Sequence, residues 1–342
     1  MSAADTAAGP AIDIARKLVG GPVLAMSRVG GGRNSRVYRV DTSDQIFALK
    51  QYPSLEDDPR DRLGVEARAL KWMSTHGLDM VPRLVATDPD SNSALLTWAE
   101  GSPVQDVYTS DIDQAADFLG YLHRLRGIAN FPTAHLASEA CLSGTEIERQ
   151  IRTRVADLNR LEDDPTLRAF LTEEFAGVLE DFLSAARKVL SSTGLSFEAE
   201  LAHERRSPVP SDFGFHNALR DGNGRLTFID FEYFGWDDPV KLTADMLLHP
   251  GTAVATELRS RFQAAAEELY GDDPDFTTRL DAFRPLFGLR WVLILLNEFH
   301  PERWRRRILA GTRDGWTEAK DRQLGAARIM LLNLKSSLKD IE

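Results

Sequence analysis

Residues 208–239 read PVPSDFGFHNALRDGNGRLTFIDFEYFGWDDP, the one block in the second half of the chain that lacks a helical pattern. Two strand-like runs, His216–Leu219 and Leu226–Phe231, flank the turn Asp221–Gly224. Apolar residues on either side of an Asp-Gly-Asn-Gly turn are typical of a β-hairpin. We therefore expect a polar hairpin embedded in an otherwise helical region.

Three polar residues of this block have a spacing that suggests chemistry. Asn217 follows Asp212 by five positions, and Asp230 follows it by eighteen, at the end of an apolar run. A strand that ends in a carboxylate presents it at the rim of a sheet, and Mg²⁺ prefers such oxygen ligands. The pattern favours Asn217 and Asp230 as metal ligands and Asp212 as the acceptor of a substrate hydroxyl proton. The alternative is a polar turn whose side chains only satisfy backbone groups.

The first third of the chain has a different pattern, with short runs rich in β-branched and aromatic residues. The predicted strands are Val23–Met26, Arg36–Val40, Gln45–Lys50, Pro82–Thr87 and Ala94–Trp98, and the predicted helices are Pro10–Leu18 and Arg60–Ser74. The first three strands follow one another closely, which indicates an antiparallel meander. Five strands with a helix predict a compact domain of about 100 residues.

A glycine-rich segment separates the first two predicted strands. Its residues are Gly30, Gly31, Gly32, Arg33, Asn34 and Ser35. The segment keeps the first two glycines of G-x-G-x-x-G and has Ser35 in place of the third. Backbone without side chains can lie close over phosphates, so the segment is a candidate phosphate-binding loop. The alternative is an ordinary turn between two strands.

Lys50 ends the third predicted strand, directly after alternating apolar residues. A lysine that faces a core is unfavourable unless it is paired with an opposite charge. Glu66, in the helix that follows, is the natural partner, and such a pair would hold the ammonium against nucleotide phosphates. The alternative is a solvated lysine and a surface glutamate.

The remainder of the chain has mainly helical spacing. The predicted helices are Asp111–Leu125 with Ser110 as N-cap, Thr145–Leu161, Leu167–Leu190, Lys241–Leu248, Ala253–Tyr270, Thr277–Asn297 and Trp316–Leu338. A β-rich first third followed by helices predicts an α+β fold with two lobes. We expect residues 1–100 to form an N-terminal nucleotide-binding lobe and residues 101–342 a helical catalytic and substrate lobe.

The chemistry-bearing residues occur in a fixed order: a glycine loop, a strand lysine, a helix glutamate, Asp-x4-Asn and a strand-end Asp. In this order the chain resembles the aminoglycoside phosphotransferase and choline kinase-like family, which has a protein-kinase-like fold. The resemblance runs from about Gly30 to Asp245. It includes Leu95–Gly101, similar to the family's hinge, and Phe118–His123, similar to its Leu-x-x-Leu-His helix. Phe228–Tyr233, with Asp237-Asp238-Pro239 after it, is similar to the metal-binding strand and the loop that follows.

The resemblance implies a role for each matching residue. Asp212 would be the catalytic base, Asn217 and Asp230 the Mg²⁺ ligands, and Lys50, paired with Glu66, the contact to the α- and β-phosphates. The glycine segment and the hinge residues Thr97, Trp98 and Ala99 would contact the nucleotide, which is ATP or GTP. Glu232 would support a second metal indirectly, and Asp245 would organise the catalytic loop.

The catalytic loop departs from the family pattern His-Gly-Asp-x-His-x-x-Asn. Pro210 stands two residues before Asp212, and Gly214 two residues after it, where the family has histidines. The departure at Gly214 removes a side-chain contact to the γ-phosphate, which His216 or Arg33 could replace. We interpret His216 as structural. The letters Asp-Phe-Gly at 212–214 match the metal motif of protein kinases by coincidence, since no apolar strand precedes them.

The composition of the chain argues against a nucleic-acid-binding, disulfide-linked or membrane-spanning protein. Hydrophobic residues make up 43% and charged residues 27% of the 342 residues, and the net charge is -11. An acidic chain does not favour nucleic acid as a partner. The single cysteine, Cys141, excludes an intramolecular disulfide. The start of the chain lacks the pattern of a secretory signal, and no apolar run approaches the ~20 residues that span a bilayer. We expect a cytoplasmic protein with no membrane partner.

Three functions remain open at this point. The preferred one is a kinase that phosphorylates a hydroxyl of a small molecule with ATP or GTP and Mg²⁺. A protein kinase is disfavoured because Pro239 follows Asp230 by only nine positions, too few for a long activation loop. A nucleotide-binding protein without activity is the third. Residues 252–307 hold acids that suit an aminoglycoside or amino alcohol and arginines that suit a sugar or anionic metabolite, so the acceptor and the oligomeric state stay open.

Overall fold

The computed structural model describes residues 9–29, 35–56, 58–127, 135–161, 164–251, 254–309 and 315–338. The chain divides into two compact units. The first comprises Met1–Val107, Ala129–Ser138 and Pro210–Gly235, and the second comprises Tyr108–Ile128, Glu139–Val209 and Trp236–Glu342. The division of the chain at residue 100 remains a prediction about the two lobes.

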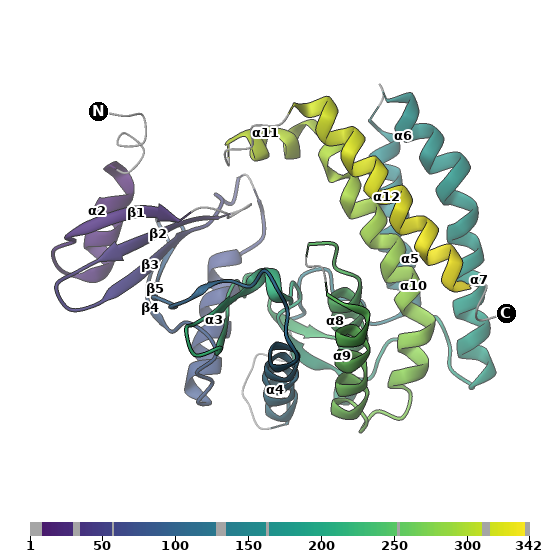
Figure 1. Ribbon diagram of the computed structural model, residues 1–342, viewed down its shortest axis with the longest axis horizontal. Helices are drawn as coiled ribbons and strands as arrows, with labels where there is room; N and C mark the ends of the chain where they lie inside the picture. Colours follow the sequence, from purple (N-terminus) through teal and green to yellow (C-terminus); the bar gives the residue numbers. More distant parts are fainter. Residues whose placement is uncertain are drawn as a thin grey trace. The chain divides into compact units, whose positions relative to one another are not determined.

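The first unit is built on a five-stranded antiparallel sheet (Figure 1). The strands, in spatial order, are β1 (Ala25–Val29), β2 (Arg36–Asp41), β3 (Ile46–Gln51), β5 (Ser93–Thr97) and β4 (Leu84–Asp88). The predicted meander and the two later strands are therefore confirmed. The first strand lies later than the predicted Val23–Met26, because pairing with β2 from Ala25↔Asp41 to Val29↔Val37 defines it, and not the apolar run.

Two helices pack against this sheet, α2 (Gly9–Val19) and α3 (Arg62–Thr75). Ala11 and Ala15 of α2 share a buried cluster with Phe47 and Leu49 of β3. Because side chains alternate along a strand, Lys50 projects from the opposite face, toward α3. Helix α3 begins two residues after the predicted Arg60, since the side chain of Asp61 accepts a hydrogen bond from Gly64 N–H and caps the helix there.

A second, three-stranded sheet carries the polar hairpin. Its strands, in spatial order, are β6 (Ser102–Pro103), β8 (Ala218–Arg220) and β9 (Leu226–Phe228). The predicted strands are too long: Phe215–Asn217 form a 3-10 turn, and the chain leaves the sheet after Phe228. Gly101, just before β6, has φ +125, and a Cβ there would lie 2.6 Å from the carbonyl oxygen of Arg220.

The second unit is mainly helical. Its helices are α4 (Thr109–Leu125), α5 (Gly144–Asn159), α6 (Pro165–Ala169), a π-helical segment (Phe170–Phe175), α7 (Ala176–Ser192), α8 (Pro239–Leu248), α9 (Thr256–Leu269), α10 (Phe276–Leu295), α11 (Pro301–Leu309) and α12 (Trp316–Leu338). Short strands β7 (Ser207–Val209) and β10 (Gly235–Asp237) pair with each other. Helix α4 starts before the predicted cap Ser110, because the Asp111 carboxylate accepts from Tyr108 N–H at 2.7 Å. Helix α11 lies outside the predicted helices.

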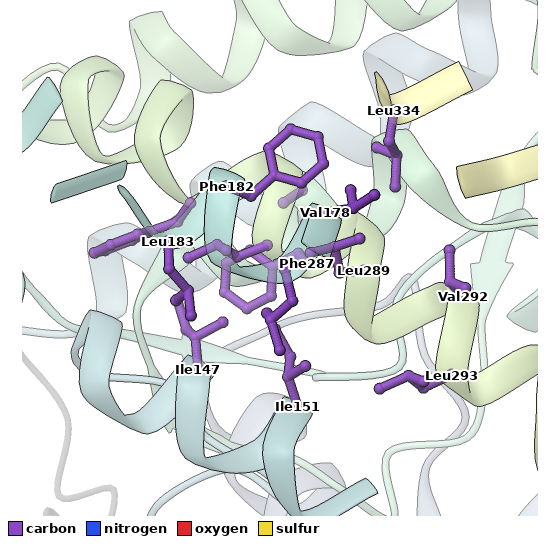
Figure 2. Close-up of a cluster of buried hydrophobic side chains, with 14 of the residues drawn as sticks. Ile147, Ile151, Val178, Phe182, Leu183, Phe287, Leu289, Val292, Leu293 and Leu334 are labelled. Carbon is purple, nitrogen blue, oxygen red and sulfur yellow. The ribbon is translucent and has the colours of Figure 1, made fainter. Parts of the chain in front are cut away.

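Helix α10 is the centre of the helical unit's core and contacts α5, α7, α8 and α12. Figure 2 shows Phe287 of α10 among Ile147 and Ile151 of α5 and Val178 and Phe182 of α7. Most residues of this helix are buried, including Arg279 and Arg290. No helix among the described residues is long and apolar enough to cross a bilayer.

Candidate functional site

The Lys50 ammonium lies between two carboxylates of the sheet unit. Its Nζ donates to Glu66 Oε2 at 2.6 Å and to Asp230 Oδ1 at 2.6 Å, and the lysine is only 6% exposed. The predicted ion pair between Lys50 and Glu66 is thus present. Asp230 joins the same ammonium although it lies 180 residues away in the sequence.

Glu66 is held by more than its lysine. Oε2 also accepts a hydrogen bond from the Tyr52 hydroxyl at 2.6 Å, and Oε1 accepts one from Phe231 N–H at 3.1 Å. Both oxygens of this buried carboxylate are therefore engaged inside the protein. Glu66 fixes the position of Lys50 and of the backbone next to Asp230.

Asp230 is the accessible carboxylate of the cluster. Its side chain is 37% exposed, whereas that of Glu66 is 2% exposed. The residue follows the end of β9 and has φ +71, a left-handed conformation that residues other than glycine rarely adopt. Such strained conformations persist only where surrounding contacts hold them, and they are common at ligand sites.

Glu232 is a third carboxylate next to the same lysine. Its Oε2 lies 3.5 Å from Lys50 Nζ and accepts a hydrogen bond from the Ser35 hydroxyl at 3.2 Å. Its Oε1 accepts from the guanidinium of Arg62, which is also buried. The sequence reasoning missed Arg62, although its position four residues before Glu66 places both side chains on one face of α3.

The charged groups around Lys50 shift one another's pKa values. Burial alone would lower the pKa of the Lys50 ammonium, but Asp230 and Glu66 outweigh it, so the pKa lies well above its usual value. Burial, followed by the charge of Asp230, raises the pKa of Glu232, against the opposing effect of Lys50 and Arg62. Lys50 is therefore a permanent cation at neutral pH, as a phosphate contact requires.

The Asp212 loop lies beside this segment in the same unit. Asn217 Nδ2 donates to the backbone oxygen of Asp212 at 2.9 Å, and the backbone oxygen of Asn217 accepts from Ile229 N–H at 2.9 Å. His216 Nε2 lies 3.2 Å from Asp212 Oδ1. The Asp212 side chain is 41% exposed. The loop is thus joined to the residue directly before Asp230, and its carboxylate is open to a ligand.

The other residues predicted to contact the nucleotide are Thr97, Trp98, Ala99 and the glycine-rich segment. Thr97 ends β5, where its hydroxyl accepts from Arg83 N–H at 2.9 Å. The Trp98 ring lies under the Arg39 guanidinium at 5.2 Å, and Ala99 follows it. The nucleotide contacts of these three residues stay predictions. Gly30, Gly31, Gly32, Arg33 and Asn34 lie outside the described residues, and Ser35 is joined to Glu232.

The donor set of the cluster fits Mg²⁺. Oxygen atoms of Glu66, Asp230 and Glu232 lie within 4.8 Å of one another, and hard cations such as Mg²⁺ take oxygen ligands. Glu66 and Glu232 are buried and engaged with cations and hydrogen-bond donors, which leaves Asp230 as the carboxylate that a metal can reach. The amide oxygen of the nearby Asn217 is a ligand of the same type.

Comparison with known proteins identifies the family. The model of the phosphotransferase enzyme family matches residues 25–283. No curated protein sequence matches the chain at a significant level. Among solved structures, the choline kinase LicA from Streptococcus pneumoniae has a TM-score of 0.60 at 15% identity, over 95% of this chain and 100% of that chain.

Two further solved structures are similar. A choline kinase from Cryptosporidium parvum has a TM-score of 0.63 at 14% identity, over 97% of this chain and 96% of that chain. A spectinomycin phosphotransferase in complex with ADP and spectinomycin has a TM-score of 0.56 at 12% identity, over 95% and 98%. These likenesses confirm the predicted α+β, protein-kinase-like fold. Since the family match covers more than half of the 342 residues, the chain belongs to the phosphotransferase enzyme family.

Proposed function

We propose that this protein is a small-molecule kinase that transfers the γ-phosphate of ATP or GTP to a hydroxyl group. The observation that carries the proposal is the Lys50 ammonium held at 2.6 Å from both Glu66 and Asp230. A lysine fixed by a helix glutamate beside a metal-ligand carboxylate is the arrangement by which kinases bind triphosphate. Membership of the family supports the same reaction.

Lys50 and Glu66 position the nucleotide in this proposal. Glu66 keeps the ammonium of Lys50 fixed, so that it contacts phosphate oxygens without a large loss of side-chain entropy on binding. Residues 1–100 would provide most of the nucleotide contacts, and the spectinomycin phosphotransferase with bound ADP supports a nucleotide in proteins of this fold.

Asp212 receives the proton in the transfer step. Its exposed carboxylate accepts a hydrogen bond from the substrate hydroxyl, orients that oxygen in line with the γ-phosphate and takes up its proton. Asp230 and Asn217 would hold Mg²⁺, which when bound would supply positive charge against the phosphate oxygens. Asn217 also fixes the backbone of Asp212 through its amide.

The acceptor is proposed as an aminoglycoside, an amino alcohol, a sugar or a related metabolite. The similar structures are named as kinases of choline and a phosphotransferase of spectinomycin, which are small molecules with hydroxyl groups. A nucleotide-binding protein without transfer activity is the second candidate. The loop residues Pro210 and Gly214, in place of two histidines, favour it.

The test is a phosphorylation screen with the purified chain. Radiolabelled ATP and GTP are offered with Mg²⁺ and a panel of aminoglycosides, amino alcohols and sugars, and the Lys50→Met variant is the matched control. We expect Mg²⁺-dependent transfer to at least one acceptor class by the wild type and none by the variant. Nucleotide binding without transfer to any compound would favour the second candidate, and absence of nucleotide binding would contradict both.

A further inference from the structure

Three consecutive residues after β9 are each tied to β3 or α3. The Asp230 carboxylate binds Lys50, the Phe231 N–H donates to Glu66, and the Glu232 carboxylate accepts from Arg62. Arg62 and Glu66 are one helical turn apart on α3. The helix therefore holds this segment at two points, the Phe231 backbone and the Glu232 side chain.

The segment needs such support because its backbone is strained. Asp230 has φ +71, and an aspartate released from its contacts would favour a negative φ. A rotation of that backbone would turn the carboxylate away from Lys50. The contacts that follow Asp230 in the chain thus decide where its oxygens point.

Arg62 is built into the protein as a fixed cation. It is 4% exposed, its Nε donates to Asp58 Oδ2 at 3.0 Å, and its guanidinium lies 5.1 Å from the centre of the Tyr233 ring. Asp58 and the ring fix the plane of the guanidinium, and Nη1 is then aimed at Glu232. A buried ion pair with this many contacts is rigid, and it is unfavourable to break.

Both oxygens of Glu232 already accept hydrogen bonds in this arrangement. Oε1 accepts from Arg62, and Oε2 accepts from Ser35 and lies 3.5 Å from Lys50. With 3% exposure it is sealed from solvent, in contrast to Asp230. Glu232 is therefore a link between charged groups and not a direct metal ligand.

We propose that Arg62 is a positioning residue for metal binding: through Glu232 it holds Asp230 in the backbone conformation that aims its carboxylate at the metal and Lys50. This inference rests on the proposed function, because it concerns the same metal-nucleotide site. It assigns a role to a buried side chain that lies outside the lysine–glutamate pair.

The test follows the binding of a fluorescent ATP analogue to the full chain as Mg²⁺ is titrated. The measured quantity is the Mg²⁺ midpoint, the Mg²⁺ concentration at which binding of the analogue is half-maximal. In Arg62→Met this midpoint should rise about tenfold to a hundredfold, as for the loss of other residues that orient a metal ligand. Binding of the analogue without Mg²⁺ should stay unchanged. Arg62→Lys should recover part of the shift, because it restores the charge without the planar guanidinium.

Arg60→Met is the matched control. Arg60 shares Asp58 and the Tyr233 ring with Arg62, but its side chain is 47% exposed against 3% for Arg62. Its Mg²⁺ midpoint should stay within about threefold of wild type, as expected for an exposed ion pair. The thermal unfolding midpoint of each variant separates lost folding from lost metal binding.

Glu232→Gln carries the test if Arg62→Met does not fold, and it should shift the Mg²⁺ midpoint in the same direction. The double variant should shift it no further than the larger single change, since both break one link. If the variants fold but keep the wild-type Mg²⁺ midpoint, the role of Arg62 is wrong while the proposed function still stands. The role of Arg62 is also wrong if the shifts of the two single variants add up in the double variant, because Glu232 would then act on the metal independently of Arg62. A wild-type chain without Mg²⁺-dependent nucleotide binding would overturn the proposed function as well.

Discussion

The sheet unit and the helical unit each contain a cluster of opposite charges. In the sheet unit the members are Lys50, Arg62, Glu66, Asp230 and Glu232. In the helical unit they are Asp237, Lys241, Asp245 and Arg290. Both clusters combine lysine, arginine and carboxylates within ion-pair distance, so composition alone does not distinguish them.

Exposure distinguishes the two clusters. In the helical unit Asp245 accepts from Arg290 at 2.7 and 2.8 Å and from Trp291 Nε1 at 2.8 Å, and all four charged members are at most 5% exposed. In the sheet unit Asp230 retains 37% exposure beside the buried lysine. A charge cluster with one accessible carboxylate can exchange partners with a ligand, whereas a fully enclosed one can only support the fold.

The largest expected effect is in the sheet unit, at the exposed carboxylate of Asp212. Asp212→Asn should lower kcat about 10²- to 10⁴-fold, because the amide cannot accept the substrate proton. Nucleotide affinity should change little, since the lysine and metal ligands are intact. Steady-state kinetics with an acceptor from the screen, together with nucleotide titration, checks both. Turnover near wild type would remove Asp212 from the reaction.

Breaking the enclosed cluster should affect stability instead. Arg290→Met leaves Asp245 buried with less compensation, so the free energy of unfolding should fall by about 3–5 kcal/mol. The double variant Arg290→Met, Asp245→Asn should recover part of that loss, because the uncompensated charge is gone. Chemical denaturation measures both values. A loss of less than about 1 kcal/mol would mean that this cluster is not structural.

The pH dependence of stability sharpens the comparison further. Burial raises the pKa of Asp237 from 3.8 to about 6. Between these values the folded chain binds more protons than the unfolded one, so this residue lowers the free energy of unfolding as pH rises from about 4 to about 6. The difference corresponds to about 3 kcal/mol. Asp237→Asn should remove this decline, and parallel pH profiles for variant and wild type would contradict it.

The smallest expected effect on stability is at an exposed ion pair, which serves as a reference for the two charge clusters. Arg149 and Glu146 form a surface ion pair at 2.6 Å, with side chains that are 63% and 30% exposed. Arg149→Ala should lower the free energy of unfolding by only about 0.2–1 kcal/mol, because water and salt screen the pair. Denaturation at low and high salt checks this. If Arg149→Ala destabilised the protein as much as Arg290→Met, burial would not explain why one ion pair matters more for stability than the other.

Local patterns made most of the sheet unit predictable. Alternating residues and turns located its strands, and a lysine among apolar residues predicted its partner Glu66, only 16 residues away. The position of Asp230 at the end of an apolar run predicted a metal ligand, the resemblance to a family implied the same role, and the structure places its carboxylate on the same ammonium. Each of these inferences used either short-range periodicity or a known motif.

Other features could not be found in the sequence. The contact from Arg62 to Glu232 joins residues 170 positions apart, and neither residue type is unusual in a helix or after a strand. The left-handed backbone of Asp230 is imposed by contacts of the folded chain, since aspartate has no strong preference for it. The predicted range of the first strand was wrong by a few residues, because pairing with β2 sets the limits of the strand and the apolar run does not.

Gly101 shows how little freedom one position near the site has. With φ +125 and a Cβ position 2.6 Å from the Arg220 carbonyl oxygen, no other residue type fits without moving one of two backbone segments. One of these segments leads into β6, and the other belongs to β8, which follows Asn217 directly. A single added methyl group there would push on the strand that follows the proposed metal ligand Asn217, so a mutational scan should find this position intolerant even though it bears no functional group.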